Sequence, residues 1–238
     1  MPQYFSNKKI WLIGGSRGMG LALAKKLISA RAKLIISSRH PPKDIDKTTY
    51  QFSPLDVGHL AAVKKLCKKL PPLDGVIFMP ALYEPGAVST IDEKFLTNMI
   101  MVNIVAPTLI TKYLASALEK RRGFLAICGS QAGNIGLPHG QPYSASKAYL
   151  KNFCESLYVE HPELTIHLIM PGFVKTDLTQ KNNFAMPFLM TADKAGDIIF
   201  AGLKAKRPII LFPKKLAWLL AVWGALPIFL QKILWTKK

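Results

Sequence analysis

Residues 9–20 read Lys-Ile-Trp-Leu-Ile-Gly-Gly-Ser-Arg-Gly-Met-Gly, and the architecture can be worked out from this segment. The apolar run 9–13 predicts a strand, and the glycines after it predict a tight turn that leads into a helix over 18–30. Such a turn lets the backbone approach a phosphate without Cβ atoms in the way, and the helix N-terminus adds N–H groups and a positive dipole end. A glycine-rich turn alone is equally consistent with a purely structural role.

Short apolar runs alternate with helix-period segments along the rest of the chain. Runs such as Leu34-Ile-Ile36 and Val76-Ile-Phe78 are continuously apolar, which is typical of parallel strands covered on both faces. The alternation predicts βαβ units and one α/β domain over residues 1–212, a doubly wound parallel sheet of the Rossmann type. We expect strands over 9–13, 33–37, 49–52, 74–79, 123–128, 164–169 and 208–212. We expect helices over 18–30, 59–69, 92–102, 104–120, 142–160 and 191–204.

The chain of 238 residues is strongly basic, with 32 Lys and Arg against 14 Asp and Glu and a formal net charge of +18. Half of the residues are hydrophobic, which supports a buried core and argues against disorder. Nucleic acid, anionic lipid and phosphorylated ligands are the partners that such a charge favours, and a solvated basic surface is the simpler interpretation of the scattered lysines. No RNA- or DNA-binding signature accompanies the charge, so we expect no nucleic-acid partner.

Three cysteines, Cys67, Cys128 and Cys154, show neither a CxxC spacing nor a Cys/His metal pattern. We therefore expect reduced thiols, no metal and a cytoplasmic setting. The first predicted strand also begins too early in the chain for a signal peptide to precede it.

The end of the second predicted strand bears on the choice of nucleotide. It reads Ser37-Ser38-Arg39-His40, without the Asp or Glu that usually binds a ribose 2′-hydroxyl. Arg39, and Arg17 in the glycine turn, could instead pair with a 2′-phosphate, because a guanidinium makes charge-assisted and often bidentate bonds to phosphate. The alternative is that both are ordinary surface arginines. Their positions favour NADP(H) as the cofactor.

Tyr143-Ser-Ala-Ser-Lys147 places a phenol and an ammonium four residues apart on one face of a predicted helix. A tyrosine has a pKa of about 10, which is high for acid–base catalysis near neutral pH. A neighbouring ammonium favours the phenolate and lowers that pKa, and Lys147 could also hydrogen-bond the ribose beside a nicotinamide. Most such pairs are surface features, so this one gains meaning from the residues around it.

Ser130 and Asn103 could complete a catalytic site. Ser130 follows the apolar strand 123–128, and ligands gather at the carboxyl ends of strands in a doubly wound sheet. Its hydroxyl could bind a substrate oxygen, or it could be a loop or helix-cap serine. Asn103 lies in an apolar helical run, where a buried amide must be hydrogen-bonded. It could hold a water that connects Lys147 to solvent, or it could be a satisfied core asparagine.

Residues 8–212 resemble the short-chain dehydrogenase/reductase family, in motifs that follow the family's order and spacing. These motifs are Gly14-x3-Gly18-x-Gly20, Asp56-Val57, Asn103, Ser130, Tyr143-x3-Lys147 and Pro171-Gly-Phe-Val-Lys-Thr-Asp177. The resemblance implies a tetrad of Asn103, Ser130, Tyr143 and Lys147, with hydride transfer at C4 of the nicotinamide. It implies that Asp56 contacts the adenine and that residues 171–176 flank the nicotinamide. The cofactor-binding residues expected in this chain are Gly14, Ser16, Arg17, Gly18, Met19, Gly20, Arg39, Asp56, Val57, Ala81, Tyr143, Lys147, Pro171, Gly172, Val174 and Thr176.

The chain departs from the family pattern in three places. Ile13 replaces a usual Thr, and Gly129 replaces a frequent Ser beside Ser130. Met79-Pro-Ala-Leu82 stands where the family reads Asn-Asn-Ala-Gly, in a segment that buttresses the sheet and lines the adenosine side of the cofactor. The last departure bears on local geometry and cofactor affinity, and it leaves room for an alternative function as a catalytically idle NADP(H)-binding sensor or scaffold.

Residues 178–191 follow the Pro-Gly motif, where the family places its substrate lid. Five apolar side chains would line this lid, so the expected substrate is a lipophilic carbonyl or alcohol, although apolar lid residues are also ordinary packing. These side chains are Phe184, Met186, Phe188, Leu189 and Met190. We also expect a homo-oligomer.

Residues 213–238 form a tail that is both basic and apolar. Leu216–Leu230 is an uncharged run of 15 residues. A bilayer crossing needs about 20 apolar residues, and Pro227 should break a helix here. Lysines bracket the run, and the tail contains Trp218, Trp223 and Trp235. This pattern suits an anionic membrane surface, which would make a cytoplasmic protein peripheral on the membrane. An oligomer contact or a cover over the substrate cleft is the competing interpretation.

Overall fold

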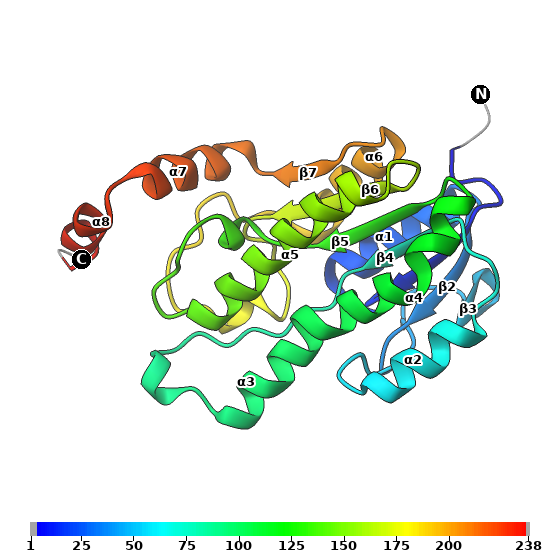
Figure 1. Cartoon of the computed structure of the whole chain (residues 1–238), viewed down its shortest axis with the longest axis horizontal. Coiled ribbons are helices and arrows are strands. Elements are labelled where there is room, and N and C mark those ends of the chain that lie inside the picture. Colours follow the sequence, from blue (N-terminus) through cyan, green and yellow to red (C-terminus); the bar gives the residue numbers. More distant parts are fainter. Residues whose placement is uncertain (1–3, 237–238) are drawn as a thin grey trace.

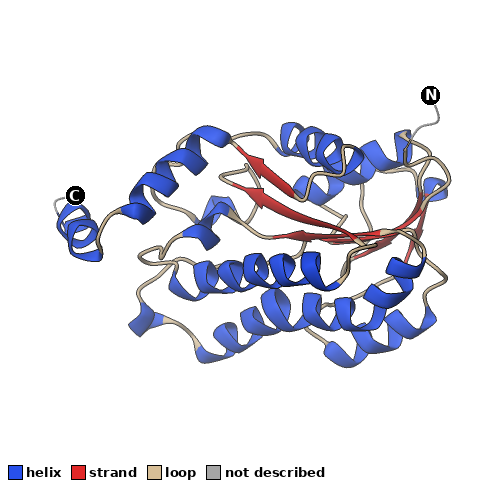
Figure 2. Ribbon diagram, turned by 45° about the horizontal axis from the view of Figure 1, so that its top comes forward, coloured by secondary structure: helices blue, strands red, loops and turns tan. Residues whose placement is uncertain are grey.

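The seven apolar runs pair into one all-parallel sheet with the strand order β3-β2-β1-β4-β5-β6-β7. The computed structural model describes residues 4–236, and Figures 1 and 2 show the sheet between two layers of helices. The order runs outward from β1 in both directions, so the predicted doubly wound, Rossmann-type fold is confirmed. The strands are β1 Lys9–Ile13, β2 Lys33–Ser37, β3 Tyr50–Phe52, β4 Gly75–Phe78, β5 Phe124–Cys128, β6 Thr165–Pro171 and β7 Ile209–Phe212.

Helices cover both faces of the sheet, which explains why the strands are apolar throughout. One face packs against α1 and α6, and the other packs against α2, α4 and α5. Each face holds its own cluster of buried side chains, so the sheet separates two cores. The helices are α1 Gly18–Ser29, α2 Leu60–Lys69, α3 Glu93–Ile100, α4 Ala106–Lys120, α5 Gln141–Glu160, α6 Ala192–Lys204, α7 Lys214–Ala225 and α8 Ile228–Thr236.

The two helices predicted over 92–102 and 104–120 are joined in the structure. A π-helical segment, Met101–Val105, continues α3 directly into α4. A π-helical turn accommodates an extra residue in the helix and often marks a functional position. The joined helix Glu93–Lys120 is long and apolar enough to cross a membrane. It packs against α2 and α5, however, and is partly buried as core helices are.

The tail folds into two short helices that leave the body of the molecule. Pro227 interrupts the helix as predicted, and the axes of α7 and α8 differ by 115°. The strands point toward the end of the molecule from which this tail projects (Figures 1 and 2). The carboxyl ends of the parallel strands and the tail therefore occupy the same end.

Candidate active site

The turn after β1 has the backbone geometry that a dinucleotide requires. Gly14 and Gly18 adopt φ values of +82° and +53°, in the left-handed region that favours glycine. A Cβ on Gly20 would lie 2.0 Å from the Gly14 carbonyl oxygen, so no side chain fits there. Arg17 begins α1 without a side-chain cap, and an uncapped helix N-terminus suits a phosphate. Half-buried Ser16 and Met19 complete a turn that fits the pyrophosphate of NAD(P).

The loop after β6 meets the glycine turn. Arg17 Nη1 donates to Asp177 Oδ2 at 2.7 Å, between two exposed side chains. A Cβ on Gly18 would lie 3.1 Å from Cγ2 of Thr176, so the two loops are in close contact. The predicted nicotinamide-flanking segment is therefore adjacent to the predicted pyrophosphate turn.

The residues at the start of this second loop are held by the last strand and by the lid. Pro171 ends β6, and the Gly172 backbone N–H donates to the Phe212 carbonyl oxygen at 2.7 Å. Val174 is buried and forms a β-bridge with Met190. These contacts fix residues 171–174 relative to the sheet.

The residues predicted for the adenosine half lie along the ends of β2 and β3. Arg39 is exposed and makes no hydrogen bond or ion pair within residues 4–236, so its guanidinium is available to a phosphate. Asp56 is exposed, and its Oδ1 accepts a hydrogen bond from the Gly58 backbone N–H at 2.9 Å, while Val57 is buried in the core. Arg17, by contrast, is already paired with Asp177.

The unusual segment 79–82 is held in place despite its departure from the family pattern. The Met79 backbone N–H donates to the Ile13 carbonyl oxygen at 3.0 Å. Three residues later, the Leu82 backbone N–H donates to Asn103 Oδ1 at 2.8 Å, and Asn103 Nδ2 returns a bond to the Leu82 carbonyl at 2.9 Å. Ala81 lies between these two attachments. Pro80 packs against the glycine turn, since a Cβ on Gly14 would lie 3.2 Å from its ring.

Asn103 is hydrogen-bonded to protein groups inside the core. It is fully buried in the π-helical segment, and besides Leu82 it contacts the Ser146 hydroxyl at 3.1 Å. Ser146 in turn donates to the Tyr143 carbonyl oxygen at 2.7 Å. The Asn103 amide therefore ties the segment 79–82 to the helix that carries Tyr143 and Lys147.

Tyr143 and Lys147 lie one turn apart on α5, as predicted, and face the carboxyl end of β5. Lys147 is only 1% exposed, and its Nζ donates to the Cys128 carbonyl oxygen at 2.8 Å. The same ammonium lies 5.7 Å from the centre of the Tyr143 ring. The pair is therefore built into the body of the protein and is not a surface feature.

The predicted direction of the pKa shift of Tyr143 was wrong. Burial raises the pKa of the Tyr143 phenol above its ordinary value, and a hydrogen bond from the Ser130 hydroxyl opposes that shift. Burial also lowers the pKa of Lys147. Desolvation by burial is the largest influence on the pKa of the phenol.

Ser130 sits directly beyond β5 and makes two kinds of contact. Its Oγ accepts from the Ala132 backbone N–H at 3.1 Å, which caps the short 3-10 turn Gln131–Asn134 (η4), and it lies 3.4 Å from the Pro171 carbonyl oxygen. Its hydrogen bond to the Tyr143 phenol places it at the reacting group as well. The cap role and the site role therefore coexist in one side chain.

Tyr83 and Asn182 belong to the site although no sequence motif indicated them. The Tyr83 ring packs on the Tyr143 ring with centroids 4.8 Å apart, and its hydroxyl donates to Asn182 Oδ1 at 2.9 Å. Asn182 lies in the lid, so Tyr83 connects the lid to the phenol. The one available signal was an aromatic residue directly after the unusual segment 79–82.

Gln131 joins the site to the tail. It is 1% exposed, and its Nε2 donates to the Pro213 carbonyl oxygen at 3.2 Å just before α7. The buried Leu216 of α7 packs against Gly172, where a Cβ would lie 2.6 Å from Leu216 Cδ2. The N-terminal half of α7 is thus part of the wall behind Ser130 and the Pro-Gly loop.

Comparison with known proteins agrees with this geometry. A family model described as short chain dehydrogenase matches residues 8–187. An uncharacterized oxidoreductase of Myxococcus xanthus is 30% identical over 219 residues, covering 86% of this chain and 87% of the relative. The 11-beta-hydroxysteroid dehydrogenase-like 2 protein of Arabidopsis thaliana is 27% identical over 245 residues, covering 93% and 79%.

Solved structures show the same fold. A short chain dehydrogenase from Burkholderia cenocepacia J2315 in complex with NADP superposes with a TM-score of 0.81 at 19% identity, covering 91% of this chain and 94% of that one. A short-chain dehydrogenase from Sphingobium yanoikuyae in complex with NADPH gives a TM-score of 0.76 at 17% identity, covering 87% and 88%. At such identities the likeness concerns the fold alone.

Proposed function

The chain belongs to the short-chain dehydrogenase/reductase family, whose members are NAD(P)-dependent oxidoreductases, and from that premise we propose that it reduces the carbonyl group of a lipophilic substrate with NADPH. The observation that carries this proposal is the convergence of Ser130, Tyr143 and Lys147 at the carboxyl end of β5, next to a turn that fits a dinucleotide. When bound, the nicotinamide supplies the hydride that the carbonyl carbon receives.

Tyr143 supplies the proton in this proposal. Because burial raises its pKa, the phenol is protonated at neutral pH and can transfer its proton to the oxygen of the reduced carbonyl. Ser130 Oγ, which hydrogen-bonds the same phenol, is placed to bind that substrate oxygen. Lys147 Nζ lies 5.7 Å from the centre of the Tyr143 ring and can offer further N–H donors to a ribose.

Replacement of Tyr143 by Phe tests the reaction. The ring and its packing on Tyr83 remain while the proton donor is lost, so NADPH oxidation with a panel of aldehydes and ketones should fall by about 10²–10⁴-fold. NADPH binding, followed by fluorescence titration, should stay within about twofold, as expected for a residue that acts in the chemical step. A parent protein that binds NADPH but oxidises it with no carbonyl would instead support the idle sensor or scaffold.

The preference for NADPH rests on Arg39, whose exposed guanidinium stands beyond β2 without a partner among residues 4–236. Arg39→Ala should weaken NADPH binding by about tenfold or more and leave NADH binding nearly unchanged, because only NADPH has the 2′-phosphate. Lys33→Ala is the matched control, since Lys33 is exposed at the opposite end of the same strand. Equal loss of both nucleotides in Arg39→Ala would show that the assignment of Arg39 is wrong.

A lipophilic substrate is supported by the lid. Phe184, Phe188 and Leu189 are 44–49% exposed, and Phe184 packs edge-on against Phe173 of the Pro-Gly loop at 6.0 Å. Exposed aromatic and aliphatic side chains beside the site favour apolar substrates over charged ones. The ratio of kcat/KM for a long-chain ketone to that for a short one measures this preference.

A further inference from the structure

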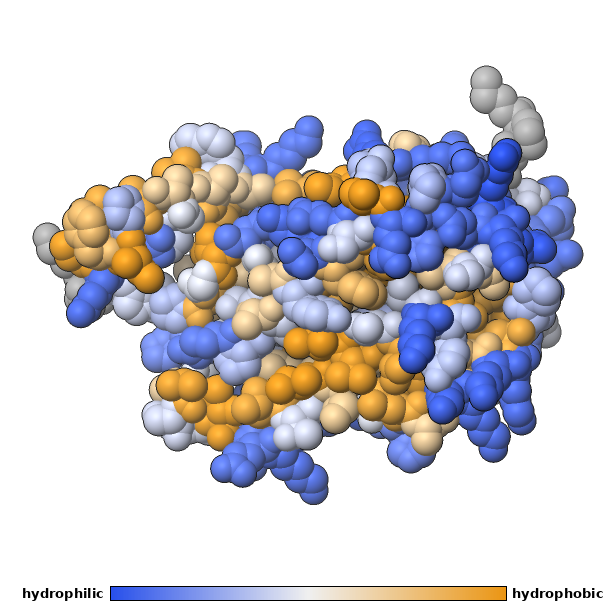
Figure 3. Space-filling model, viewed as in Figure 1, coloured by the Kyte–Doolittle hydropathy of each residue, from blue (hydrophilic) through white to orange (hydrophobic). Residues whose placement is uncertain are grey.

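The two tail helices present large apolar side chains to solvent on a scale unusual for a folded domain. Ile228 is 84% exposed and Trp218 is 67% exposed. Contiguous exposed apolar patches generally mark a binding surface. The exposed apolar side chains of α7 and α8, together with Phe188 of the lid, form what we call the tail surface. Its residues are Phe188, Trp218, Leu219, Val222, Ile228, Phe229, Ile233, Leu234 and Trp235. Figure 3 shows apolar colour gathered over this end of the molecule.

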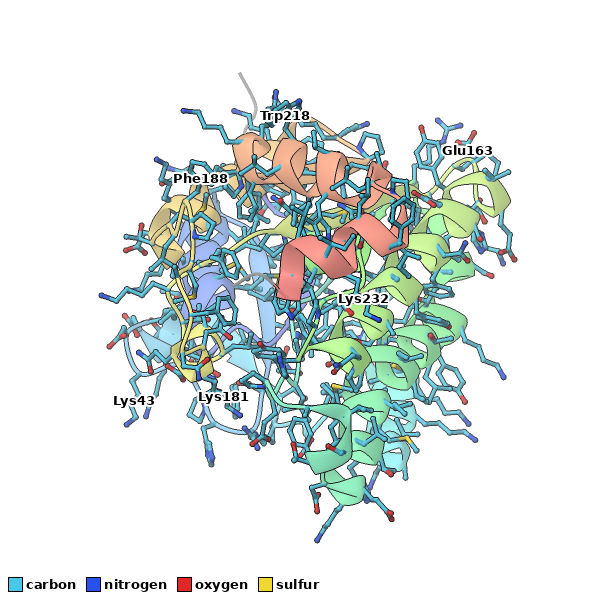
Figure 4. All side chains as sticks on the ribbon, turned by 90° about the vertical axis from the view of Figure 1, so that its left-hand side faces the viewer. Lys43, Glu163, Lys181, Phe188, Trp218 and Lys232 are labelled. Carbon is cyan, nitrogen blue, oxygen red and sulfur yellow. The ribbon has the colours of Figure 1, made fainter. Side chains whose placement is uncertain are left out.

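The tail surface is anchored to the enzyme body through one side of α7. Leu216 is buried against Gly172, Gln131 bonds the carbonyl of Pro213, and a Cβ on Gly224 would lie 3.1 Å from Ile135. With that side of α7 occupied, Trp218, Leu219 and Val222 are left in solvent. Figure 4 looks onto this end, with Trp218 and Phe188 close together and α8 crossing below α7.

The charges around the tail surface indicate its partner. Residues 198–238 contain no Asp or Glu and eight Lys or Arg, and Lys214 and Lys215 are exposed beside Trp218. A second copy of this chain docked on the same surface would bring Lys214 and Lys215 of the two copies close together, and like charges oppose that contact. Nucleic acid matches the charge but not the apolar side chains. Only an anionic lipid surface matches both, and tryptophans with flanking lysines are typical of the lipid–water interface.

We infer that the tail surface docks on an anionic membrane, with α7 and α8 lying in the lipid–water interface. Neither helix can cross a bilayer, because 12 residues of α7 extend about 18 Å and the hydrocarbon core is about 30 Å thick. The 115° angle between the helices also prevents the pair from forming one straight crossing. Both helices can lie in a plane, which is the geometry of a peripheral anchor.

The docking geometry places the substrate lid at the lipid surface. Phe188 of the lid, Trp218 and Leu219 of α7 and the two lysines line one shallow groove of about 450 Å³. An apolar carbonyl compound dissolved in the membrane would therefore reach the lid without crossing water. This last step rests on the function proposed above, whereas the docking itself does not.

Vesicle binding by the full chain tests the inference. The protein is sedimented with sucrose-loaded vesicles of phosphatidylcholine alone, or of phosphatidylcholine mixed with phosphatidylglycerol. We expect binding to the mixed vesicles and weaker binding to the neutral ones. The double variant Ile228→Ser/Phe229→Ser should bind the mixed vesicles about tenfold or more weakly, because it loses apolar contact area. Lys214→Gln/Lys215→Gln should lose affinity for the mixed vesicles only.

Tyr158→Ser/Val159→Ser is the matched control, because these two side chains are 57% and 80% exposed at the end of α5 opposite to Tyr143. This control should bind vesicles as the parent does. NADPH titration and turnover of a water-soluble aldehyde, measured on every variant, show whether the site is intact. If neither the parent nor any variant oxidised NADPH with this aldehyde or with lipophilic ketones, the proposed function would be wrong, and the vesicle results would still test the docking.

Three results would overturn the docking. The parent could stay in the supernatant with both kinds of vesicle, the Ile228/Phe229 variant could bind as well as the parent, or the control could lose as much affinity as that variant. Light scattering distinguishes docking on a membrane from contact with a second copy of this chain. If Ile228→Ser/Phe229→Ser lowers the oligomeric mass and leaves vesicle binding unchanged, then the tail surface contacts a second copy and the inference is wrong.

Discussion

Burial dominates the chemistry of individual residues in this site. The Tyr143 phenol is surrounded by the Tyr83 ring, Ser130 and the end of β5, and that environment keeps the proton on the phenol. Lys147 is deeper still, and its contact with the Cys128 carbonyl fixes the ammonium in one position. The phenol is therefore in the protonated form, which can donate to a substrate oxygen.

Tyr83 should act as a positioning residue for the lid. Tyr83→Phe keeps the ring against Tyr143 and removes the hydroxyl that donates to Asn182. A single hydrogen bond contributes about 0.5–1.5 kcal/mol, so we expect KM for the carbonyl substrate to rise about two- to tenfold, with kcat and NADPH affinity nearly unchanged. Steady-state kinetics with a lipophilic ketone measures KM and kcat separately and so checks this prediction.

A double-mutant cycle identifies the partner of Tyr83. Asn182→Ala removes the acceptor of the same hydrogen bond, so the double variant should lose little more than either single variant. Full additivity of the two losses would mean that the contact between the two residues does not hold the lid.

His167 makes the folded protein sensitive to mild acid. It is fully buried in β6, its Nδ1 pairs with the Arg207 carbonyl oxygen at 2.6 Å, and burial lowers its pKa. The unfolded chain therefore takes up a proton below about pH 6.5, where the folded chain stays neutral. Above that pH, the free energy of unfolding keeps the whole contribution of neutral His167. It falls as the pH drops toward the lowered pKa, by up to about 1.4 kcal/mol per pH unit.

Urea unfolding at several pH values between neutral and mildly acidic measures that slope. His167→Leu should flatten it, because the titrating group is gone. His40→Leu changes an exposed histidine and should leave the slope as it is in the parent. A slope that survives in His167→Leu would assign the acid sensitivity to other groups.

At the scale of elements, the π-helical segment holds three parts of the site together through Asn103. Asn103→Ala would leave the buried backbone groups of Leu82 and the Ser146 hydroxyl without this partner. We expect the free energy of unfolding to fall by about 2–5 kcal/mol. Urea unfolding followed by circular dichroism measures the change.

Asn103→Asp is the informative companion variant, since it retains an acceptor for the Leu82 N–H and loses the donor to the Leu82 carbonyl. It should be destabilised as well, because Asn103 contacts Leu82 and Ser146, and neither offers a cation to a buried carboxylate. A stability unchanged in both variants would show that the amide network contributes nothing to the fold.

Elements could be predicted from the sequence wherever a local pattern determines them. The glycine turn, the seven strands and the one-turn spacing of Tyr143 and Lys147 all follow from periodicity and turn chemistry, and the structure has them. The contact of Tyr83 with Tyr143, the bond from Lys147 to the Cys128 carbonyl and the lid residue Asn182 could not be predicted. They join segments far apart in the chain, and no local preference specifies such pairs.

The predictions failed on the direction of one pKa shift and on one helix boundary, and both depend on packing between distant segments. The pKa of Tyr143 was expected to fall because Lys147 is near in sequence, but the burial that raises it comes from distant segments. The helices expected over 92–102 and 104–120 are joined by a π-helical segment, and the amide of Asn103 within it bonds to Leu82 inside the core. In the tail, only the break at Pro227 was predicted, because a proline ring ends a helix by itself.

At the scale of the whole molecule, the net charge of +18 opposes the compact state. Added salt shortens the range of this repulsion, from about 30 Å at 0.01 M to about 8 Å at physiological ionic strength. We therefore expect Tm to rise as NaCl is added over this range. Differential scanning calorimetry or fluorimetry measures it.

Lys64→Gln/Lys65→Gln provides the control for the salt effect. Both lysines are exposed in α2, before the last turn, where Lys68 and Lys69 favour the helix dipole. The variant should have a smaller salt dependence of Tm than the parent. A Tm that is flat or falls with salt in the parent would mean that paired charges outweigh the excess of positive ones.

The packing of Leu216 on Gly172 makes the C-terminus a poor place for a fusion tag. A domain fused beyond α8 would lie next to α7, whose Leu216 packs on the loop that contains Gly172. Phe5 packs on Phe124 at the amino end of β5, and Figure 1 shows the blue first segment and the red helix α8 at opposite ends of the molecule. Purification handles, labels and surface tethers therefore belong at the N-terminus of this protein.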